Sequence, residues 1–259
     1  AEFVRELDPG EIVIIDDNGV RSLSVPATGR SSFCIFEYIY FARPDSTFSG
    51  CNVYETRKAF GRQLAKEAPV DADLVMPFPD SGNYAAIGYS EASGIPFEMG
   101  MIRNHYVGRT FIQPTQSMRD FGVRVKLNPV KELLRGKEII IIEDSIIRGT
   151  TAKTRVKALR ELGVKKVHLR VSGPAHRFPC HYGIDFSTKG ELIAAKMSTE
   201  ELGRHLGLDS LYYLSLDGLL EATGMENPAQ CFCKACFDGC YPVQFDENLS
   251  KDCMESLAG

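Results

Sequence analysis

The sequence predicts an α/β fold in which a mostly parallel sheet is flanked by helices. Three observations support this prediction. Strand-like and helix-like segments alternate between about residue 34 and residue 216, as they do in the βα units that build parallel sheets. Residues 138–142, EIIII, form an apolar, β-branched run that indicates a strand buried on both faces. Two carboxylates and a loop of small residues follow this strand, at the edge where open α/β sheets bind ligands.

The expected elements follow one another in a regular order. Strands are expected over residues 37–41, 72–78, 96–101, 138–142, 166–171 and 210–216. Helices are expected over residues 53–67, 83–93 and 150–162. In the last of these, Val156, Leu159 and Leu162 recur at helical spacing, and Gly163 ends the helix.

The two ends of the chain differ from this central part. Residues 11–16 and 20–25 read as two short strands joined by the turn DDNG, and because a lone hairpin is marginal they are expected to join a sheet. A polar linker, PATGRSS, follows at 26–32. We therefore divide the chain into residues 1–32, a main domain over 33–225 and a cysteine-rich tail over 226–259.

Composition excludes several classes of protein. The chain has 259 residues, of which 44% are hydrophobic and 25% charged, as in ordinary globular proteins. A net charge of −4 argues against a nucleic-acid binder. No apolar run is long enough to cross a membrane, and the first residues lack the basic start and apolar centre of a signal peptide. We therefore expect a cytoplasmic protein without nucleic-acid or membrane partners.

The segment after the 138–142 strand has the residue types of a phosphate and sugar site. Glu143 and Asp144 suit the vicinal hydroxyls of a sugar, and carboxylates are also Mg²⁺ ligands. The following loop can turn backbone N–H groups and the hydroxyls of Thr150 and Thr151 toward a phosphate at the start of the next helix. The alternative is a simple helix cap, which does not explain the second carboxylate and both threonines.

Two further loops are candidates for the same site. The long polar stretch 103–129 contains Arg109 and Lys126, and it is either a solvated surface loop or a lid over the site. The loop PDSG at 79–82 follows another expected strand. It is either a type I turn, or it places Ser81 as a contact for metal or pyrophosphate.

The cysteines predict a metal site. Four of the eight crowd into ten residues near the end of the chain, at Cys231, Cys233, Cys236 and Cys240. Without a secretory signal the thiols are expected to stay reduced, so metal binding is favoured over disulfides. The spacing of Cys233 and Cys236 places two thiolates on one metal centre. From spacing alone, zinc and a cluster held by the tail both remain open.

Residues 138–151 resemble the phosphoribosyl pyrophosphate (PRPP) signature of the type I phosphoribosyltransferases. EYIYFARPDS at 37–46, RNHYVGRTFIQP at 103–114 and the cysteine-rich end narrow the resemblance to the amidophosphoribosyltransferases, along essentially the whole chain. The resemblance implies the type I phosphoribosyltransferase fold. It also implies transfer of ammonia, taken from glutamine in the complete enzyme, to C1 of PRPP. The products would be 5-phosphoribosylamine and pyrophosphate, in the first step of purine biosynthesis.

Two positions depart from the family pattern. Glu143-Asp144 stands where the family usually has two aspartates, and because the charge is kept we expect the Mg²⁺ and ribose contacts to survive. Family members begin with a glutaminase domain whose N-terminal cysteine is the nucleophile, whereas this chain begins with Ala1. Residues 1–32 are therefore expected to be the last strands of an absent glutaminase domain, followed by a linker.

The resemblance also assigns roles to particular residues. Arg109 and Lys126 are the expected catalytic residues, on a lid that pairs with departing pyrophosphate and excludes water. The expected PRPP-binding residues are Glu143, Asp144, Ser145, Arg148, Gly149, Thr150 and Thr151. The expected Mg²⁺ contacts are Ser81, Glu143 and Asp144.

The cysteine-rich end and the assembly are interpreted in the same way. The resemblance implies a [4Fe–4S] cluster, with a structural role, ligated by Cys34, Cys180, Cys233 and Cys236. It also implies feedback inhibition by purine nucleotides and a homo-oligomeric assembly. Two alternatives remain open from the sequence. One is a phosphoribosyltransferase with a purine or pyrimidine base as acceptor, and the other is a non-enzymatic iron–sulfur module that senses PRPP or nucleotides.

Overall fold

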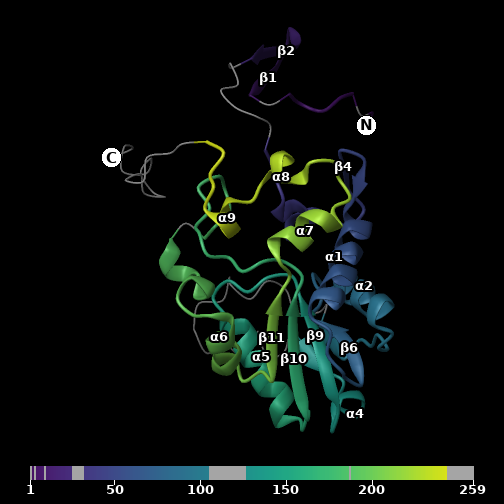
Figure 1. The fold of residues 1–259 in the computed structure, drawn as a ribbon. Coiled ribbons are helices and arrows are strands. Elements are labelled where there is room, and N and C mark those ends of the chain that lie inside the picture. The colour runs from purple at the N-terminus through teal and green to yellow at the C-terminus, as the bar shows by residue number, and fades with distance from the viewer. Residues whose placement is uncertain are drawn as a thin grey trace.

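The computed structural model has the expected α/β architecture (Figure 1). It describes residues 2, 4–8, 10–24, 32–104, 127–186 and 188–243. The central sheet has four parallel strands in the order β11-β10-β9-β6. These strands are β6 (Leu74–Pro77), β9 (Glu138–Glu143), β10 (Lys166–Val171) and β11 (Ser210–Tyr213).

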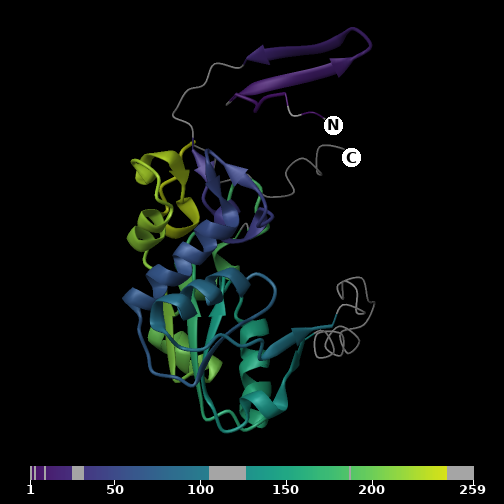
Figure 2. The same ribbon diagram turned by 90° about the vertical axis from the view of Figure 1, so that its right-hand side faces the viewer.

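Helices cover both faces of this sheet, as the two views of the ribbon show (Figure 2). On one face lie α1 (Val53–Glu67) and α2 (Asn83–Ser93), and their buried side chains share a core with Ile140 and Ile142. On the other face, α5 (Thr150–Glu161) and α6 (Thr199–Leu206) share a core with Ile139 and Ile141. Successive side chains of a strand point to opposite faces, so the isoleucine run of β9 serves both cores.

The first helix pair is held at unusually close range by two glycines. A Cβ atom at Gly61 of α1 would overlap the backbone carbonyl of Ala85, and one at Gly88 of α2 would overlap that of Lys58. The helix starts are also defined locally. Asn52 caps α1 by accepting a hydrogen bond from the N–H of Glu55 at 3.2 Å.

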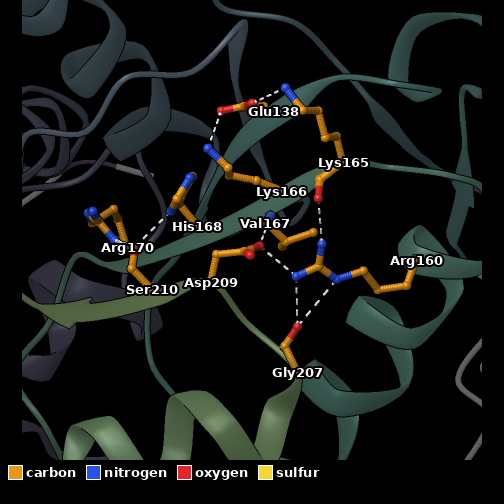
Figure 3. Close-up of polar contacts among 10 residues, drawn as sticks. All are labelled: Glu138, Arg160, Lys165, Lys166, Val167, His168, Arg170, Gly207, Asp209 and Ser210. Carbon is orange, nitrogen blue, oxygen red and sulfur yellow. Dashed lines mark hydrogen bonds and ion pairs between the residues drawn. The ribbon is translucent and has the colours of Figure 1, made fainter.

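A polar network fixes α5 to the sheet at the end away from the loop that precedes the helix (Figure 3). Arg160 of α5 donates to the carboxylate of Asp209 at 2.5 Å and to the carbonyl oxygen of Gly207 at 3.0 Å. Asp209 in turn accepts from the backbone N–H of Val167 at 2.7 Å. These contacts join the last turn of α5 to β10 and to the start of β11.

Residues 37–41 form a π-helix, η1 (Glu37–Phe41), so the prediction of a strand was wrong. The aromatic and β-branched composition of this run favours a strand, but its buried residues Ile35, Tyr38 and Ile39 follow helical spacing. The buried guanidinium of Arg57 supports the turn by donating to three carbonyl oxygens, those of Glu37, Tyr38 and Ala42.

The other expected elements are present with shifted bounds. The strand expected over 96–101 is instead an isolated bridge at Phe97, followed by β7 (Met101–Arg103). The strand expected over 210–216 ends at Tyr213, because Ser215 caps the helix α7 (Leu216–Ala222) through the N–H of Gly218. The strand predicted over 210–216 was therefore correct in place but too long, whereas the strand predicted over 96–101 overlaps β7 only at Met101.

The remaining elements lie outside the four-stranded sheet. The first part of the chain forms a hairpin, and the tail pairs with the start of the main domain. These strands are β1 (Glu11–Asp16), β2 (Gly19–Ser24), β3 (Phe33–Cys34), β4 (Thr47–Phe48), β5 (Cys51–Asn52), β8 (Leu127–Pro129) and β12 (Phe232–Cys233). The helices are α4 (Lys131–Leu134), η3 (Lys189–Glu191), η4 (Ile193–Ala195), α8 (Pro228–Cys231) and α9 (Ala235–Asp238).

The stretch 103–129, expected to form a lid, begins at the last residue of β7 and ends with β8, and these two strands pair antiparallel. Arg109 and Lys126 fall outside the described residues, so their role stays a prediction. None of the helices in the described part of the chain has the length and apolarity needed to span a membrane.

Candidate functional site

A cleft of about 1060 Å³ opens at the carboxyl ends of β6 and β9. Parallel strands end at this edge, so the loops that follow them meet there. The cleft brings together all of the PRPP and Mg²⁺ residues expected from the sequence, namely Ser81, Glu143, Asp144, Ser145, Arg148, Gly149, Thr150 and Thr151. What these residues bind stays a prediction.

Asp144 is the most enclosed acidic residue of the cleft, with only 4% of its surface exposed. Burial raises the pKa of its carboxyl group, whereas hydrogen bonds with the hydroxyls of Ser145 and Ser81 act in the opposite direction. Ser145 and Ser81 come from the loops after β9 and β6. The carboxylate and two hydroxyls therefore form one oxygen-rich group drawn from two strands, which is the ligand chemistry that Mg²⁺ prefers.

Glu143 lies beside Asp144 and pairs with a cation. Its Oε2 accepts a hydrogen bond from Nη1 of Arg155 at 2.9 Å. Burial raises the pKa of Glu143 well above its ordinary value, the negative charge of Asp144 adds to this rise, and Arg155 opposes it. Glu143 and Asp144 are neighbouring buried carboxyl groups, so they need nearby positive charge if both are to be ionised at once.

The loop before α5 has the geometry of an anion site. Gly149 adopts a left-handed conformation with φ +75° at the start of the helix and has no side chain to cap it. The first N–H groups of α5, together with the Thr150 and Thr151 hydroxyls, can therefore face an anion in the cleft. Arg148 instead pairs with Glu191 of η3 at 3.2 Å, an exposed ion pair that contributes little to stability.

The PDSG loop is held against β9 by a glycine. A Cβ atom at Gly82 would overlap the carbonyl oxygen of Ile142, so only glycine allows this approach. The N–H of Phe78 also bonds to the same carbonyl oxygen at 2.8 Å. These contacts carry Ser81 to Asp144, a consequence that the turn motif alone could not predict.

Several cleft residues were missed by the sequence analysis. Arg57 and Arg155 come from helix faces, where an arginine is usually a surface residue, and nothing in their local sequence separates them from other arginines. Tyr40 and Phe41 form an aromatic wall and are each 49% exposed. They stand within EYIYFARPDS, so the motif marked the segment but not the direction of its side chains.

The four cysteines predicted as cluster ligands come together in the structure. Cys34 and Cys233 are paired residues of the neighbouring strands β3 and β12. Burial raises the pKa of Cys34 to about 11, and negative charge on Cys233 and Cys180 adds to this rise. Burial also raises the pKa of Cys236, as do Cys34, Cys180 and Cys233. Cys180 likewise raises the pKa of Cys233, so all pairings within the quartet are close enough to interact.

The quartet fits a metal group in its donor chemistry. The pKa values of Cys34, Cys233 and Cys236 are raised, so these thiols stay protonated unless a cation compensates the thiolate charge, and bound metal would supply that charge. Among the described residues, no three His, Cys, Asp or Glu side chains have the spacing to share a single metal ion. All cysteines in the described ranges are free thiols.

Comparison with known proteins identifies relatives of this chain, although no family model matches it. It is 53% identical to the amidophosphoribosyltransferase of Synechococcus elongatus, over 97% of this chain and 50% of the relative. It is 48% identical to the amidophosphoribosyltransferase of Methanocaldococcus jannaschii, over 97% of this chain and 56% of the relative.

Solved structures agree with the sequence relatives. The glutamine PRPP amidotransferase from B. subtilis, complexed with ADP and GMP, is 47% identical with a TM-score of 0.84, over 97% of this chain and 56% of that one. The fold is therefore that of a type I phosphoribosyltransferase. The chain spans about half the length of the relatives it matches, and within that span it belongs to the amidophosphoribosyltransferase family.

Proposed function

We propose that the cleft binds Mg²⁺-PRPP and that the chain transfers ammonia to C1 of the sugar, releasing pyrophosphate. One observation carries this proposal. A buried carboxylate with two hydroxyl partners and the uncapped N-terminus of α5 face the same cleft. PRPP needs both groups, since it carries a 5′-phosphate, ribose hydroxyls and a metal-binding pyrophosphate.

Different residues of the cleft would bind different groups of PRPP. The N-terminus of α5, with the hydroxyls of Thr150 and Thr151, would hold the 5′-phosphate through charge-assisted hydrogen bonds. Glu143 and Asp144 would accept hydrogen bonds from the ribose hydroxyls. Mg²⁺, held through Asp144 and Ser81, would neutralise charge on the pyrophosphate.

The chemical step needs little from the protein beyond positioning and charge. The lone pair of ammonia forms a bond to C1 with inversion while the C1–O bond breaks, and the pyrophosphate leaves with the electron pair. The nitrogen then loses a proton to solvent, giving 5-phosphoribosylamine. Tyr40 and Phe41 would keep water from the cationic sugar by walling one side of the cleft.

The role in the cell follows from the relatives as a further part of this proposal. They are named amidophosphoribosyltransferases, and this reaction with glutamine as nitrogen source is the first step of purine biosynthesis. We infer that purine nucleotides inhibit the chain by placing their 5′-phosphates in the same loop. The B. subtilis protein is described in complex with ADP and GMP, which supports this inference.

The phosphate loop offers a direct test. Replacing Thr150 and Thr151 together by Val removes two hydroxyls but keeps the helix start and the shape of both side chains. Hydrogen bonds to a charged group contribute about 1.5–3 kcal/mol each, so the free energy of PRPP binding should weaken by several kcal/mol in titration calorimetry. The control is Thr154→Val on the same helix, since its hydroxyl bonds to the carbonyl oxygen of Thr150 at 3.1 Å. Unchanged PRPP affinity in the double variant would overturn the assignment.

We also propose that Cys34, Cys180, Cys233 and Cys236 hold a [4Fe–4S] cluster with a structural role. Each thiolate binds a different iron in such a cluster, so its ligands stand farther apart than those of one zinc ion. The mutual influence of the four thiols supports one shared site for a metal group, and the family resemblance favours a cluster over zinc there. The cluster would fasten β12 of the tail to β3.

Metal analysis tests this second proposal. Protein purified without oxygen should contain about four irons per chain and absorb visible light. Cys→Ser at any of the four positions should remove the colour and lower solubility. Cys51→Ser is the matched control, because Cys51 is also half-buried and packs on the same core. One zinc per chain with no visible absorbance would contradict the proposal.

A further inference from the structure

Arg155 is a cleft arginine that reaches an expected sugar-binding carboxylate from a helix. It lies in the second turn of α5, and 19% of its side chain is exposed. Its guanidinium carbon lies 4.6 Å from the centre of the Phe78 ring, and Nη1 donates to Oε2 of Glu143 at 2.9 Å. The Phe78 face and the Glu143 oxygen together fix the plane of the guanidinium.

Arg155 differs from the structural arginines of this chain in its hydrogen bonding. Arg57 and Arg170 are more deeply buried, and each donates to three oxygen acceptors of the protein. Within the described residues, Arg155 donates to Glu143 alone, and its buried Nε has no partner there. An arginine buried only to support the fold would be expected to satisfy more of its donors.

Glu143, the partner of Arg155, needs a contact that fixes its side chain. Glu143 has one more rotatable bond than the aspartate that the family pattern carries, and the like charge of Asp144 repels it. The Arg155 contact engages Oε2 and does not involve Oε1. Glu143 is thereby held by Arg155 and by a side-chain hydrogen bond with Asp144. Each carboxylate oxygen has two lone pairs, so Glu143 can still accept a hydrogen bond from a ligand.

We propose that Arg155 is a positioning residue that fixes Glu143 to accept a hydrogen bond from a ribose hydroxyl, so that this pair sets the preference for ribose over deoxyribose. The inference rests on the proposed binding of PRPP. It adds a specificity device, with ribose 5-phosphates bearing both ring hydroxyls as the ligand class. Without Arg155, the side chain of Glu143 would keep only its hydrogen bond with Asp144, whose like charge disfavours the ionised acceptor.

The test compares ligands that differ by one hydroxyl. Ribose 5-phosphate and its 2-deoxy and 3-deoxy analogues compete with PRPP for the purified chain, and titration calorimetry gives their affinities. The unaltered chain should prefer ribose 5-phosphate over one analogue by about tenfold or more, the value of one hydrogen bond to a charged group. In Arg155→Met this preference should shrink to about threefold or less, and Arg155→Lys should restore part of it.

Two further variants separate positioning from support of the fold. The double variant Glu143→Gln with Arg155→Met should lose no more of the preference for ribose 5-phosphate over its deoxy analogue than either single variant loses, because the two residues act as one unit. Arg160→Met is the matched control on the same helix, since Arg160 pairs with Asp209 outside the cleft. It should keep the full ribose preference even where its stability falls.

The outcomes are distinct. An Arg155→Met variant that binds PRPP with an unaltered ribose preference would overturn the inference and leave the proposed function standing. Failure of the unaltered chain to bind PRPP or ribose 5-phosphate would reject the proposed function together with the inference. Affinity for inorganic phosphate should be the same in all variants, because the N-terminus of α5 is unchanged.

Discussion

His176 is a fully buried imidazole at the centre of an aromatic cluster beside the cysteine quartet. The rings of Phe36, Phe186 and Phe237 contact it edge-on, with centroid distances of 5.1, 5.4 and 4.7 Å. Neither ring nitrogen has a hydrogen-bond partner within the described ranges. The structure therefore places an unpaired imidazole in the core of the described part of the chain.

This burial predicts a pH dependence of stability. Burial lowers the pKa of His176 to about 3, against an ordinary value of 6.5. Below pH 6.5 His176 binds a proton in the unfolded chain but stays neutral in the folded chain. The free energy of unfolding should therefore fall as the pH falls and level off near pH 3. Between pH 7 and pH 5 the loss from this residue should be about 2 kcal/mol.

Urea unfolding of the unaltered chain and of His176→Phe at pH 7 and pH 5 measures this loss. Phenylalanine suits the aromatic surroundings and cannot titrate, so the variant should lack that part of the pH dependence. Equal pH dependence in both proteins would show that another group is responsible.

Among the helices and strands, local sequence predicted the bounds of α1 and α2 correctly but assigned the wrong element to residues 37–41. The ranges predicted for α1 and α2 agree with the structure, because an asparagine cap at Asn52 and a left-handed glycine at Gly94 mark their ends. The run 37–41 was assigned the wrong element because its composition favours a strand. Its turn depends on Arg57, which is distant in sequence, and no local signal carries that contact.

The glycine contact between α1 and α2 gives a prediction at this scale. Helix propensity alone would make Gly88→Ala stabilising by about 1 kcal/mol. The new Cβ would instead overlap the Lys58 backbone, which cannot move without separating the helices. We expect the free energy of unfolding to fall by about 1–3 kcal/mol.

Thermal or urea unfolding shows whether Gly88→Ala raises or lowers the free energy of unfolding. Gly190→Ala in η3 is the control, because no atom lies within 4 Å of the position that its new Cβ would take. This control should change stability by less than about 0.5 kcal/mol. A Gly88→Ala variant as stable as the unaltered chain would show that the helix pair can adjust.

At the scale of the whole molecule, the sequence predicted the βα order and the main cleft residues, because strand ends in parallel sheets converge on one edge. It could not predict which helix side chains enter the cleft. Arg155 and Arg57 reach it only through the packing of α5 and α1 against the sheet. The pairing of β3 with β12 joins the start of the main domain to the tail. This contact was expected from the family resemblance and could not be predicted from the spacing of the cysteines.

The proposed transfer of ammonia to PRPP in this cleft can be measured as release of pyrophosphate, with ammonium chloride as nitrogen donor and with or without Mg²⁺. We expect release that depends on Mg²⁺, requires ammonia and is lost in Asp144→Asn, whose amide keeps the shape of the side chain but not its charge. Thr154→Val should retain the activity. Release that requires a purine or pyrimidine base instead of ammonia, or that persists in Asp144→Asn, would contradict the proposed transfer.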